Sequence, residues 1–528
     1  MKKLLIVSIA VVLIGYLCIS GIAYIHDKDY AERAAVRLAA SPQASGIREV
    51  LDRNACYYCH STKTVLPNYA ALPGIRQLAE HDIQTGLAYF RIDSLYAALE
   101  SGVPAPESDL AKLETVVNER SMPPKLFRFV HWTTGLSADD QRAFLDWIAS
   151  QRHSAYATPG VAPEFANEPV QPLPHSLPTD AGKVALGKQL FNDVRLSVDN
   201  TISCASCHKL AIGGVDGNKV SSGVGGQLGA INAPTVFNSA LNRKQFWDGR
   251  AATLQEQAGG PPLNPVEMAS TSWSEIIDKL KQDSSLTQQF LRVYRHGWSG
   301  ENITDAIAEY ETTLLTPSRF DAYLRGDRDV LNSEELRGYQ LFKANHCATC
   351  HVGKNLGGQS FERMGLAADY FAARGYARTD ADNGRANFTK DPLDRHAFKT
   401  PTLRNVELTA PYFHDGSRID LREAVRDMAT YQVGKQLAES DIDAIVAFLR
   451  TLTGTLPFHA MTISRQTASP CRGRRVPVDT VSPVVFSNAL LRRYDGYTFA
   501  PRVRAFKTGC ADGYGASSWS PHGQAAGS

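Results

Sequence analysis

The chain carries one pentapeptide three times, as Cys56-Tyr-Tyr-Cys59-His60, Cys204-Ala-Ser-Cys207-His208 and Cys347-Ala-Thr-Cys350-His351. This Cys-x-x-Cys-His pattern attaches c-type haem: two thioethers hold the porphyrin, and the adjacent histidine becomes the proximal iron ligand. A zinc site would need a second pair of ligands at each motif, and a redox dithiol needs no histidine there. The sequence therefore predicts three covalently bound haem c groups, with His60, His208 and His351 as iron ligands.

Composition places few limits on function. The chain has 528 residues, enough for three or four domains of about 150 residues each. Hydrophobic residues make up 43% and charged residues 21%, as is usual for a globular protein. The net charge of +2 gives no reason to expect nucleic acid as a partner.

The N-terminus is predicted to be a transmembrane anchor covering residues 1–26. The run from Leu4 to Ile25 has no charged residue, and as a helix it would be about 33 Å long, enough to cross a bilayer. A cleaved signal peptide has a shorter apolar core and a small-residue exit, which we do not find before His26. Lys2 and Lys3 favour a cytoplasmic N-terminus, so we expect an inner-membrane protein with its body in the periplasm.

The first haem motif begins a predicted cytochrome unit over residues 27–165. Downstream of the motif lie Ser121-Met122-Pro123-Pro124 and then a capped amphipathic helix from Ser137 to Ile148. This order resembles a class I cytochrome c, in which a methionine on a later loop is the sixth iron ligand. Met122 is the predicted ligand, and His81 and His131 are the alternatives.

Two further units are predicted after it. The proline-rich stretch 155–178 reads as a connector, the second unit covers residues 166–320, and the third covers residues 321–456. Glycines between Gly213 and Gly229 suit a segment that wraps a flat group. The third unit repeats the cytochrome order, with Met428 as sixth ligand and a closing helix around 441–452. The basic tail, 457–528, is predicted to be disordered. The expected fold is mainly α: three class I cytochrome c-like domains in tandem after an N-terminal transmembrane helix.

From Pro178 to Gly454 the sequence resembles the bacterial dihaem cytochrome c peroxidases. The matching blocks are Gly213-Gly214-Val-Asp216, Asn232-Ala-Pro234-Thr, Phe246-Trp247-Asp248-Gly249-Arg250-Ala251, Glu267-Met268 and Thr409-Ala-Pro411-Tyr-Phe-His414. The anchor and the extra haem unit resemble the trihaem, membrane-anchored branch of this family, the quinol peroxidase type.

The resemblance implies a role for each matching residue. The haem on Cys204 and Cys207 would be the peroxidatic one, and the haem on Cys347 and Cys350, with Met428 as ligand, would transfer electrons. Glu267 matches the acid/base glutamate, Gln257 the glutamine beside it and Trp247 the tryptophan between the two haems. Asn232, Thr409 and Pro411 fall where the family holds a calcium ion through oxygen ligands.

One departure from the family pattern concerns the peroxidatic haem. Many members place a capping histidine in the glycine-rich stretch, but this chain has Val224 in the run Ser221 to Gly226. Valine cannot bind iron, so we expect an open, high-spin ferric site that needs no reductive activation. Spacing alone would make Met268 the sixth ligand, but the adjacent carboxylate of Glu267 suits the proton transfer that peroxide cleavage needs.

The predicted function is therefore reduction of hydrogen peroxide to water at an open haem. Electrons would come from membrane quinol, or from a soluble cytochrome c or cupredoxin, through two further haems. The alternatives are a multihaem electron-transfer cytochrome without peroxidase activity, or a MauG-like enzyme that modifies a protein. The MauG-like subgroup has a tyrosine where Met428 stands, which argues against that alternative.

Overall fold

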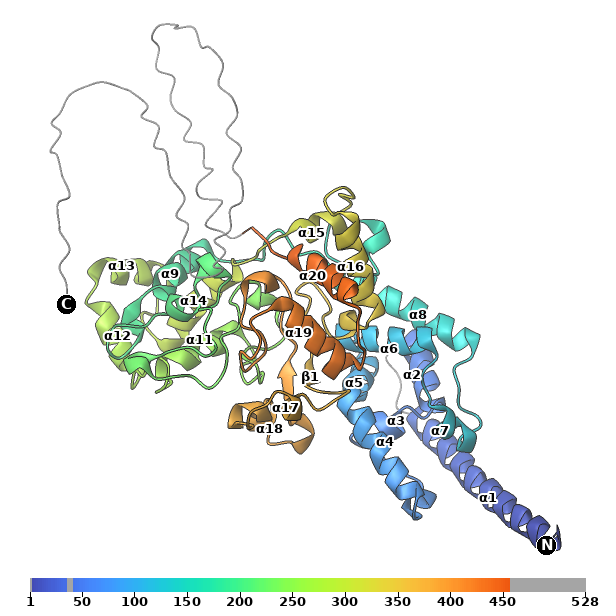
Figure 1. Cartoon of the computed structure of the whole chain (residues 1–528). Coiled ribbons are helices and arrows are strands. Elements are labelled where there is room, and N and C mark those ends of the chain that lie inside the picture. Colours follow the sequence, from blue (N-terminus) through green and yellow to red (C-terminus); the bar gives the residue numbers. More distant parts are fainter. Residues whose placement is uncertain (1, 36–40, 456–528) are drawn as a thin grey trace, which may run out of the picture. The chain divides into compact units, whose positions relative to one another are not determined.

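The computed structural model describes residues 2–35 and 41–455, and these are mainly helical (Figure 1). The predicted disordered tail lies outside the described residues. A helical cytochrome-type fold is therefore confirmed for the described part of the chain.

The first haem motif lies in a helical unit that follows the N-terminal helix. Its elements are α1 (Lys2–Ala35), α2 (Pro42–Arg53), α3 (Tyr57–His60), η1 (Asn68–Ala71), α4 (Ile75–Tyr89), α5 (Asp93–Ser101), α6 (Glu107–Glu119), α7 (Lys125–Val130), α8 (Ala138–Gln151), η2 (Arg152–Tyr156) and η3 (Pro163–Phe165). The predicted cap of the closing helix is present, because the Ser137 side chain accepts a hydrogen bond from Asp140 N at the start of α8. A buried cluster centred on Leu95, Phe144 and Trp147 forms the core of this unit.

The second motif lies in a unit with its own core. Its elements are α9 (Ala181–Phe191), η4 (Val194–Leu196), α10 (Cys204–Cys207), η5 (Leu210–Ile212), η6 (Val224–Gly226), η7 (Ser239–Leu241), α11 (Leu254–Leu263), α12 (Trp273–Lys281), α13 (Ser284–Val293) and α14 (Gly300–Thr312). Helices α9 and α14 cross closely at Gly187, where an added Cβ would come within 1.8 Å of Ala306 O. A side chain at Gly187 would therefore force these two helices apart.

The third unit repeats the same crossing. Its elements are α15 (Arg319–Leu324), α16 (Ser333–Ala344), η8 (Cys347–Thr349), β1 (Phe361–Arg363), α17 (Tyr370–Ala373), η9 (Asp380–Asn383), α18 (Ala386–Thr389), η10 (Pro392–Asp394), β2 (Ala397–Lys399), η11 (Val406–Leu408), α19 (Leu421–Asp427), η12 (Met428–Val433) and α20 (Glu439–Arg450). Gly338 in α16 lies against α20, with Ala444 O 1.9 Å from the position of an added Cβ. Strands β1 and β2 pair antiparallel, with Phe361 opposite Lys399.

The proline-rich stretch is more than a connector. Phe165 and Val170 are buried in the core of the third unit, and Gly353 N donates to Pro169 O at 2.8 Å. The chain thus contacts the third unit before it forms the second one. The domain limits expected from the sequence stay a prediction.

Several ion pairs join the first unit to the third. Lys112 Nζ on α6 lies 2.8 Å from Glu362 Oε1 on β1, and both side chains are largely buried. Arg91 pairs with Asp394 at 2.8 Å. Because a buried charge without its partner is costly, the Lys112–Glu362 pair favours one register of this contact.

Helix α1 has the length and composition to cross a membrane: within the described residues it is the one helix that does. Residues up to Gly15 are exposed, whereas Ser20, Ala23 and Asp27 are buried against the first unit. These buried positions recur at helical spacing. One end of α1 is therefore free to enter lipid, and the other end is packed on the first unit.

Candidate haem sites and peroxide pocket

The three motif histidines share one geometry. In each, Nδ1 hydrogen-bonds a backbone carbonyl of a later loop. The acceptors are Phe90 O for His60 at 3.0 Å, Gly214 O for His208 at 3.3 Å, and Leu356 O for His351 at 3.2 Å. A histidine whose Nδ1–H is used in this way presents the Nε2 lone pair to a metal.

The electrostatics of these histidines also fit iron binding. Burial lowers the pKa of His60 and His208, and it lowers the pKa of His351 to about 4. All three imidazoles are thus neutral at physiological pH, which is the form that binds a metal. The residues present therefore fit proximal haem ligands at each motif.

One cavity of about 730 Å³ reaches both the first and the third motif. Its lining contains the following haem-site residues: Cys56, Cys59, His60, Met122, Cys347, Cys350, His351 and Met428. A mainly apolar cavity that is lined by Met122 and Met428 as well as by the two histidine motifs suits haems with Met sixth ligands. Because the cavity is continuous, the two haem sites adjoin.

The alternative ligands of the first haem lie in different places. His81 lines the same cavity as Met122. His131 does not, because its Nδ1 lies 2.7 Å from Asp27 Oδ2 and its Nε2 lies 2.7 Å from the Tyr69 hydroxyl. With both ring nitrogens engaged, His131 is a poor candidate, whereas Met122 and His81 both stay open as predictions.

Lys399 is a site residue that the sequence interpretation missed. It lines the cavity at the end of β2 and is buried, and this burial lowers the pKa of its ammonium group to about 8. No described carboxylate forms an ion pair with it. A buried lysine without an acidic partner suits a haem propionate. The available signal was a lysine in the otherwise apolar strand Ala397–Lys399.

Glu267 lies beside the second motif, as the peroxidase pattern requires. Asn264 Nδ2 donates to Glu267 Oε1 at 2.7 Å. Burial raises the pKa of Glu267, and the opposing effects of Arg250 and Asn264 are smaller. Its charge contributes to the raised pKa of the Cys204 and Cys207 thiols, after the larger effect of burial. A carboxyl group with a raised pKa close to the haem attachment suits proton transfer.

The glycine-rich segment is held directly against Glu267. Val224 N donates to Glu267 O at 2.8 Å. An added Cβ at Gly223 would come within 2.0 Å of Val266 O, so only glycine allows this approach. Val224 and Glu267 therefore adjoin in one backbone wall, and the absence of a ligand histidine from this segment stays a prediction about the second haem.

The remaining predicted residues of this region are less closely connected. Gln257 is half-buried on α11. Met268 is 2% exposed and belongs to the core of the second unit. Its position in this core matches the expectation that it packs, and the expectation that it does not bind iron stays a prediction.

Glu311 was also missed. This α14 glutamate is buried, and burial raises its pKa to about 8. Within the described residues its Oε2 has no hydrogen-bond partner. Its charge would raise the pKa of the Cys204 thiol, so it lies near the second motif. The signal was its spacing: Glu311 follows Ile307 by one helical turn on the core-facing side.

Trp247 lies between the second and third units. Its Nε1 donates to Asn232 O at 2.9 Å, and its ring contacts Phe398 and His414 edge-on. Trp247 also lines the cavity that contains His351. It is therefore placed where an electron could pass from the third haem site toward the second unit.

The three calcium candidates face the same cavity. Asn232 is buried, and its Nδ2 donates to Asn218 O at 2.9 Å, so its Oδ1 points away from that carbonyl. Thr409 and Pro411 flank a turn that precedes His414. Backbone and amide oxygens are suitable calcium ligands, so these donors are of a type that fits the ion, and calcium binding here stays a prediction.

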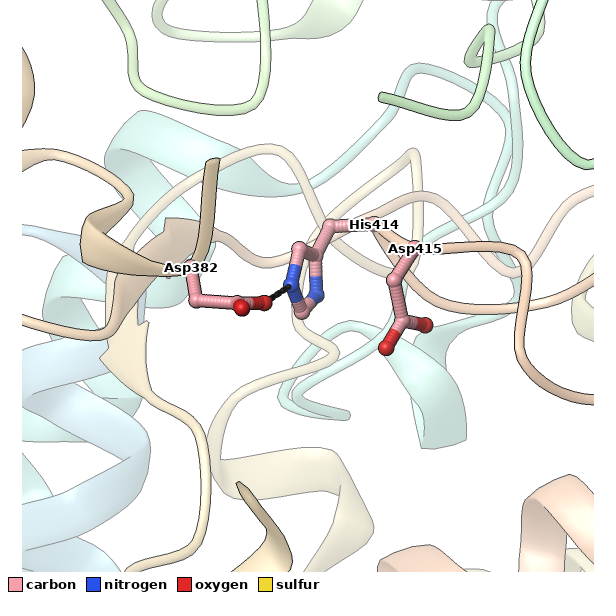
Figure 2. Close-up of side chains that lie close together, drawn as sticks. All are labelled: Asp382, His414 and Asp415. Carbon is pink, nitrogen blue, oxygen red and sulfur yellow. Dashed lines mark hydrogen bonds and ion pairs between the residues drawn. The ribbon is translucent and has the colours of Figure 1, made fainter. Parts of the chain in front are cut away.

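Figure 2 shows a second group of metal-ligand types, with His414 between Asp382 and Asp415. Here a guanidinium group already pairs with both carboxylates. Arg374 Nη2 lies 2.6 Å from Asp382 Oδ2, and Arg374 Nη1 lies 2.9 Å from Asp415 Oδ2. Burial alone would raise the pKa of Asp382, but hydrogen bonds from Arg374, His414 and the backbone of Thr379 lower it well below its usual range. The group is therefore an ion-pair network, and His414 O in turn accepts a hydrogen bond from Asn232 N.

Together these features define a c-type cytochrome. Family models match along the chain: a haem-binding domain at residues 15–150, di-haem cytochrome c peroxidase at 181–329 and cytochrome c at 336–453. Cytochrome c peroxidase Ccp of Escherichia coli is 52% identical over 86% of this chain and 97% of its own length. The cytochrome c551 peroxidases of Nitrosomonas europaea and Pseudomonas aeruginosa are 47% and 42% identical, over 57% and 52% of this chain and 88% and 79% of their lengths. The chain belongs to the di-haem cytochrome c peroxidase family. It is a peroxidase that carries covalently bound haem c.

Proposed function

We propose that the peroxide reaction takes place in the second unit, at the haem held by His208. The observation that carries this proposal is the backbone contact between Val224 and Glu267, together with the raised pKa of the Glu267 carboxyl group. We infer that this wall supplies no sixth ligand to the second haem. The bound haem supplies the iron that binds peroxide and delivers electrons to it. Reduction of one peroxide consumes two electrons and two protons and yields two waters.

The protein's own groups move the protons. The carboxylate of Glu267 takes a proton from one peroxide oxygen and returns it to the other, so that this second oxygen leaves as water and not as hydroxide. Asn264 fixes the carboxylate by its 2.7 Å hydrogen bond. Gln257 is assigned the role of orienting the peroxide, as its counterpart does in the family.

The electron path is proposed to run from the first haem to the third and then to the second. The continuous cavity supports the first transfer, and the position of Trp247 supports the second. This path needs three haem c groups per chain, one at each motif. Calcium held by Asn232, Thr409 and Pro411 would stiffen the contact that carries Trp247.

The electron donor is proposed to be a membrane quinol. Helix α1 supports an inner-membrane anchor with the body in the periplasm. The relatives are named cytochrome c peroxidases, which makes a small cytochrome c the main rival, and a cupredoxin a second one.

The test is steady-state peroxide reduction by membranes that contain the protein, first with a quinol and then with reduced cytochrome c. We expect quinol to support turnover, three haems per chain by pyridine haemochrome, and a high-spin ferric signal in the oxidised protein. Low-spin, six-coordinate spectra for every haem would contradict the open site. Turnover with cytochrome c alone would overturn the choice of donor and leave the peroxidase reaction standing.

A further inference from the structure

A buried polar cluster lies where α1 meets the first haem unit, and the peroxide chemistry does not use it. Asp27 of α1 accepts a hydrogen bond from the Tyr58 hydroxyl at 2.8 Å and lies 2.7 Å from His131 Nδ1. The Tyr69 hydroxyl lies 2.7 Å from His131 Nε2. Asp27 is 6% exposed and His131 is 4% exposed.

The hydrogen-bond roles in this cluster follow from the carboxylate. Because an ionised Asp27 can only accept, His131 Nδ1 carries the proton and donates it. His131 Nε2 is then an acceptor, and the Tyr69 hydroxyl donates to it. Within the described residues, the acceptor His131 Nε2 is therefore occupied only by the hydroxyl of Tyr69, a half-buried residue on the short η1 segment. Another hydroxyl compound could take its place.

The cluster is one aromatic ring away from the first haem site. The Phe127 ring stacks on His131, with centroids 3.9 Å apart and an angle of 6°. Phe127 itself lines the cavity that contains His60 and Met122. Tyr58, which bonds Asp27, stands inside the first haem motif. An electron donor bound at His131 would thus be close to this haem.

On its other side the cluster adjoins a surface that continues onto α1 and carries three large exposed apolar side chains beside the exposed Arg128. Leu126, Phe129 and Trp132 flank His131 and are 61%, 62% and 50% exposed. The Tyr16 hydroxyl of α1 donates to Phe129 O at 2.9 Å, and the two rings are in contact. The segment 126–132 therefore lies at the depth of Tyr16 along α1.

That depth falls inside a bilayer. From Lys3, the last charged residue before the apolar run, α1 rises only about 20 Å to Tyr16, whereas a bilayer's hydrocarbon core is about 30 Å thick. The lipid layer must therefore extend past Tyr16 to the exposed side chains of segment 126–132. Within the described residues, Ser20 Oγ, one turn further along α1, is buried and has no hydrogen-bond partner. The Ser20 hydroxyl is thus a polar group that is available between the lipid-facing segment 126–132 and Asp27.

We propose that the His131–Asp27 pair is the quinol-oxidation site of this protein, entered from the bilayer past Phe129 and Trp132. This inference rests on the proposed function and specifies where its donor binds. A quinol hydroxyl displaces the Tyr69 hydroxyl and donates to His131 Nε2. Quinol is oxidised to quinone with loss of two protons and two electrons. The electrons pass singly to the ferric iron of the first haem, which returns to the ferric state between them, and the protons leave through His131 and Asp27.

The first test compares two donors on His131→Gln in membranes. With quinol, we expect peroxide turnover to fall by about 100-fold, the usual effect of losing a proton acceptor. With ascorbate-reduced tetramethylphenylenediamine, which reaches the haems from water, turnover should stay within about twofold, since no quinol proton is transferred. His153→Gln, an exposed histidine of the same unit, is the matched control and should keep both rates.

The outcomes separate this inference from the proposed function. A full quinol rate in His131→Gln overturns the site. An equal loss with both donors also overturns it, because it shows a structural role for the pair. If the unchanged protein turns over with the soluble donor but not with quinol, the site is wrong and the peroxidase reaction stands. If it turns over with neither, the proposed function itself fails.

A second test does not depend on turnover. A photoreactive azido-quinone added to membranes should label the peptide that contains residues 126–132, and excess quinol should compete with it. The Phe129→Ser, Trp132→Ser variant should label weakly and show a raised KM for quinol. Leu291→Ser, which removes an exposed leucine from α13, should label normally. Labelling elsewhere in the chain, or labelling of segment 126–132 that quinol does not reduce, would overturn the proposal.

Discussion

The three haem motifs have the same kind of proximal histidine, but their distal surroundings differ. The first and third motifs share one cavity, whereas the second motif lies beside the wall formed by Val224 and Glu267. Met122 and Met428 line the shared cavity. Beside the second motif, Val224 and Glu267 are hydrogen-bonded through the backbone, and Met268, the residue after Glu267, is buried in the core. An iron with a thioether ligand is suited to carry electrons, whereas an iron without one can bind a substrate. The attachment motif alone thus does not decide the chemistry of a haem.

The largest effect is expected from removing the acid/base group of the second unit. Glu267→Gln should lower peroxide turnover by about 100-fold or more, because no group then transfers the proton. The glutamine carbonyl can still accept from Asn264, so the haem spectra should not change. Glu301→Gln, an exposed change at the start of α14, is the control. Retained turnover in Glu267→Gln would show that Glu267 is not the acid/base group, whereas a lack of turnover in the unchanged protein would point to a pure electron-transfer cytochrome.

The distinction between open and closed sites can be reversed at one position. Val224→His should give the second haem a sixth ligand and a low-spin ferric spectrum. If the new ligand caps the second haem in more than 90% of the oxidised protein, peroxide turnover should start about tenfold lower and recover when this haem is reduced. Electron paramagnetic resonance and stopped-flow assays measure both effects. Leu228→His, at an exposed position of the same segment, should leave the spectrum high-spin.

Substitution of Trp247, which lies between the second and third units, should have a smaller effect. Trp247→Phe removes the hydrogen bond to Asn232 O. We expect electron transfer from the third haem to the second to slow by about tenfold, a change of about 1.4 kcal/mol in the barrier. Flash reduction followed by haem-resolved spectra measures this step. Trp298→Phe, whose buried Nε1 has no partner within the described residues, should not change it.

The smallest effect concerns stability. Folding raises the pKa of Glu311 to about 8, so between pH 4.5 and about 8 the folded protein keeps a proton that the unfolded chain has released. Stability should therefore fall as pH rises through this window, by about 1.4 kcal/mol per pH unit. Glu311→Gln should flatten the dependence in urea unfolding of the haem-loaded protein, and Glu309→Gln should not. Identical slopes for Glu311→Gln and the unchanged protein would show that Glu311 is not buried in its neutral form.

Local patterns predicted much of the fold and of the candidate site. The helices near Ser137, Ile303 and Asp441 were expected from their caps and apolar spacing, and they are present as α8, α14 and α20. The proline-rich stretch was read from composition as a spacer, but Phe165 and Val170 pack into the third unit. Composition indicates a stiff backbone and does not say which core will accept its side chains.

The sequence interpretation also missed several buried residues, and the reason is related. Lys399, Glu311 and the His131–Asp27 pair are ordinary residue types, and their significance lies in burial and in partners distant in the sequence. Asp27 and His131 meet only because α1 packs on the first unit. No spacing rule connects positions so far apart.

By itself the sequence predicted the haem attachment sites and the proximal ligands, and it determined the presence of a membrane-length helix. Each of these depends on neighbours along the chain, because thioether spacing and hydrophobic length are local properties. Tertiary structure decided which haem cavities adjoin, which carboxyl groups are buried enough to hold a proton, and where α1 meets a histidine. These features depend on burial and on contacts between distant segments, which exist only once the helices have packed.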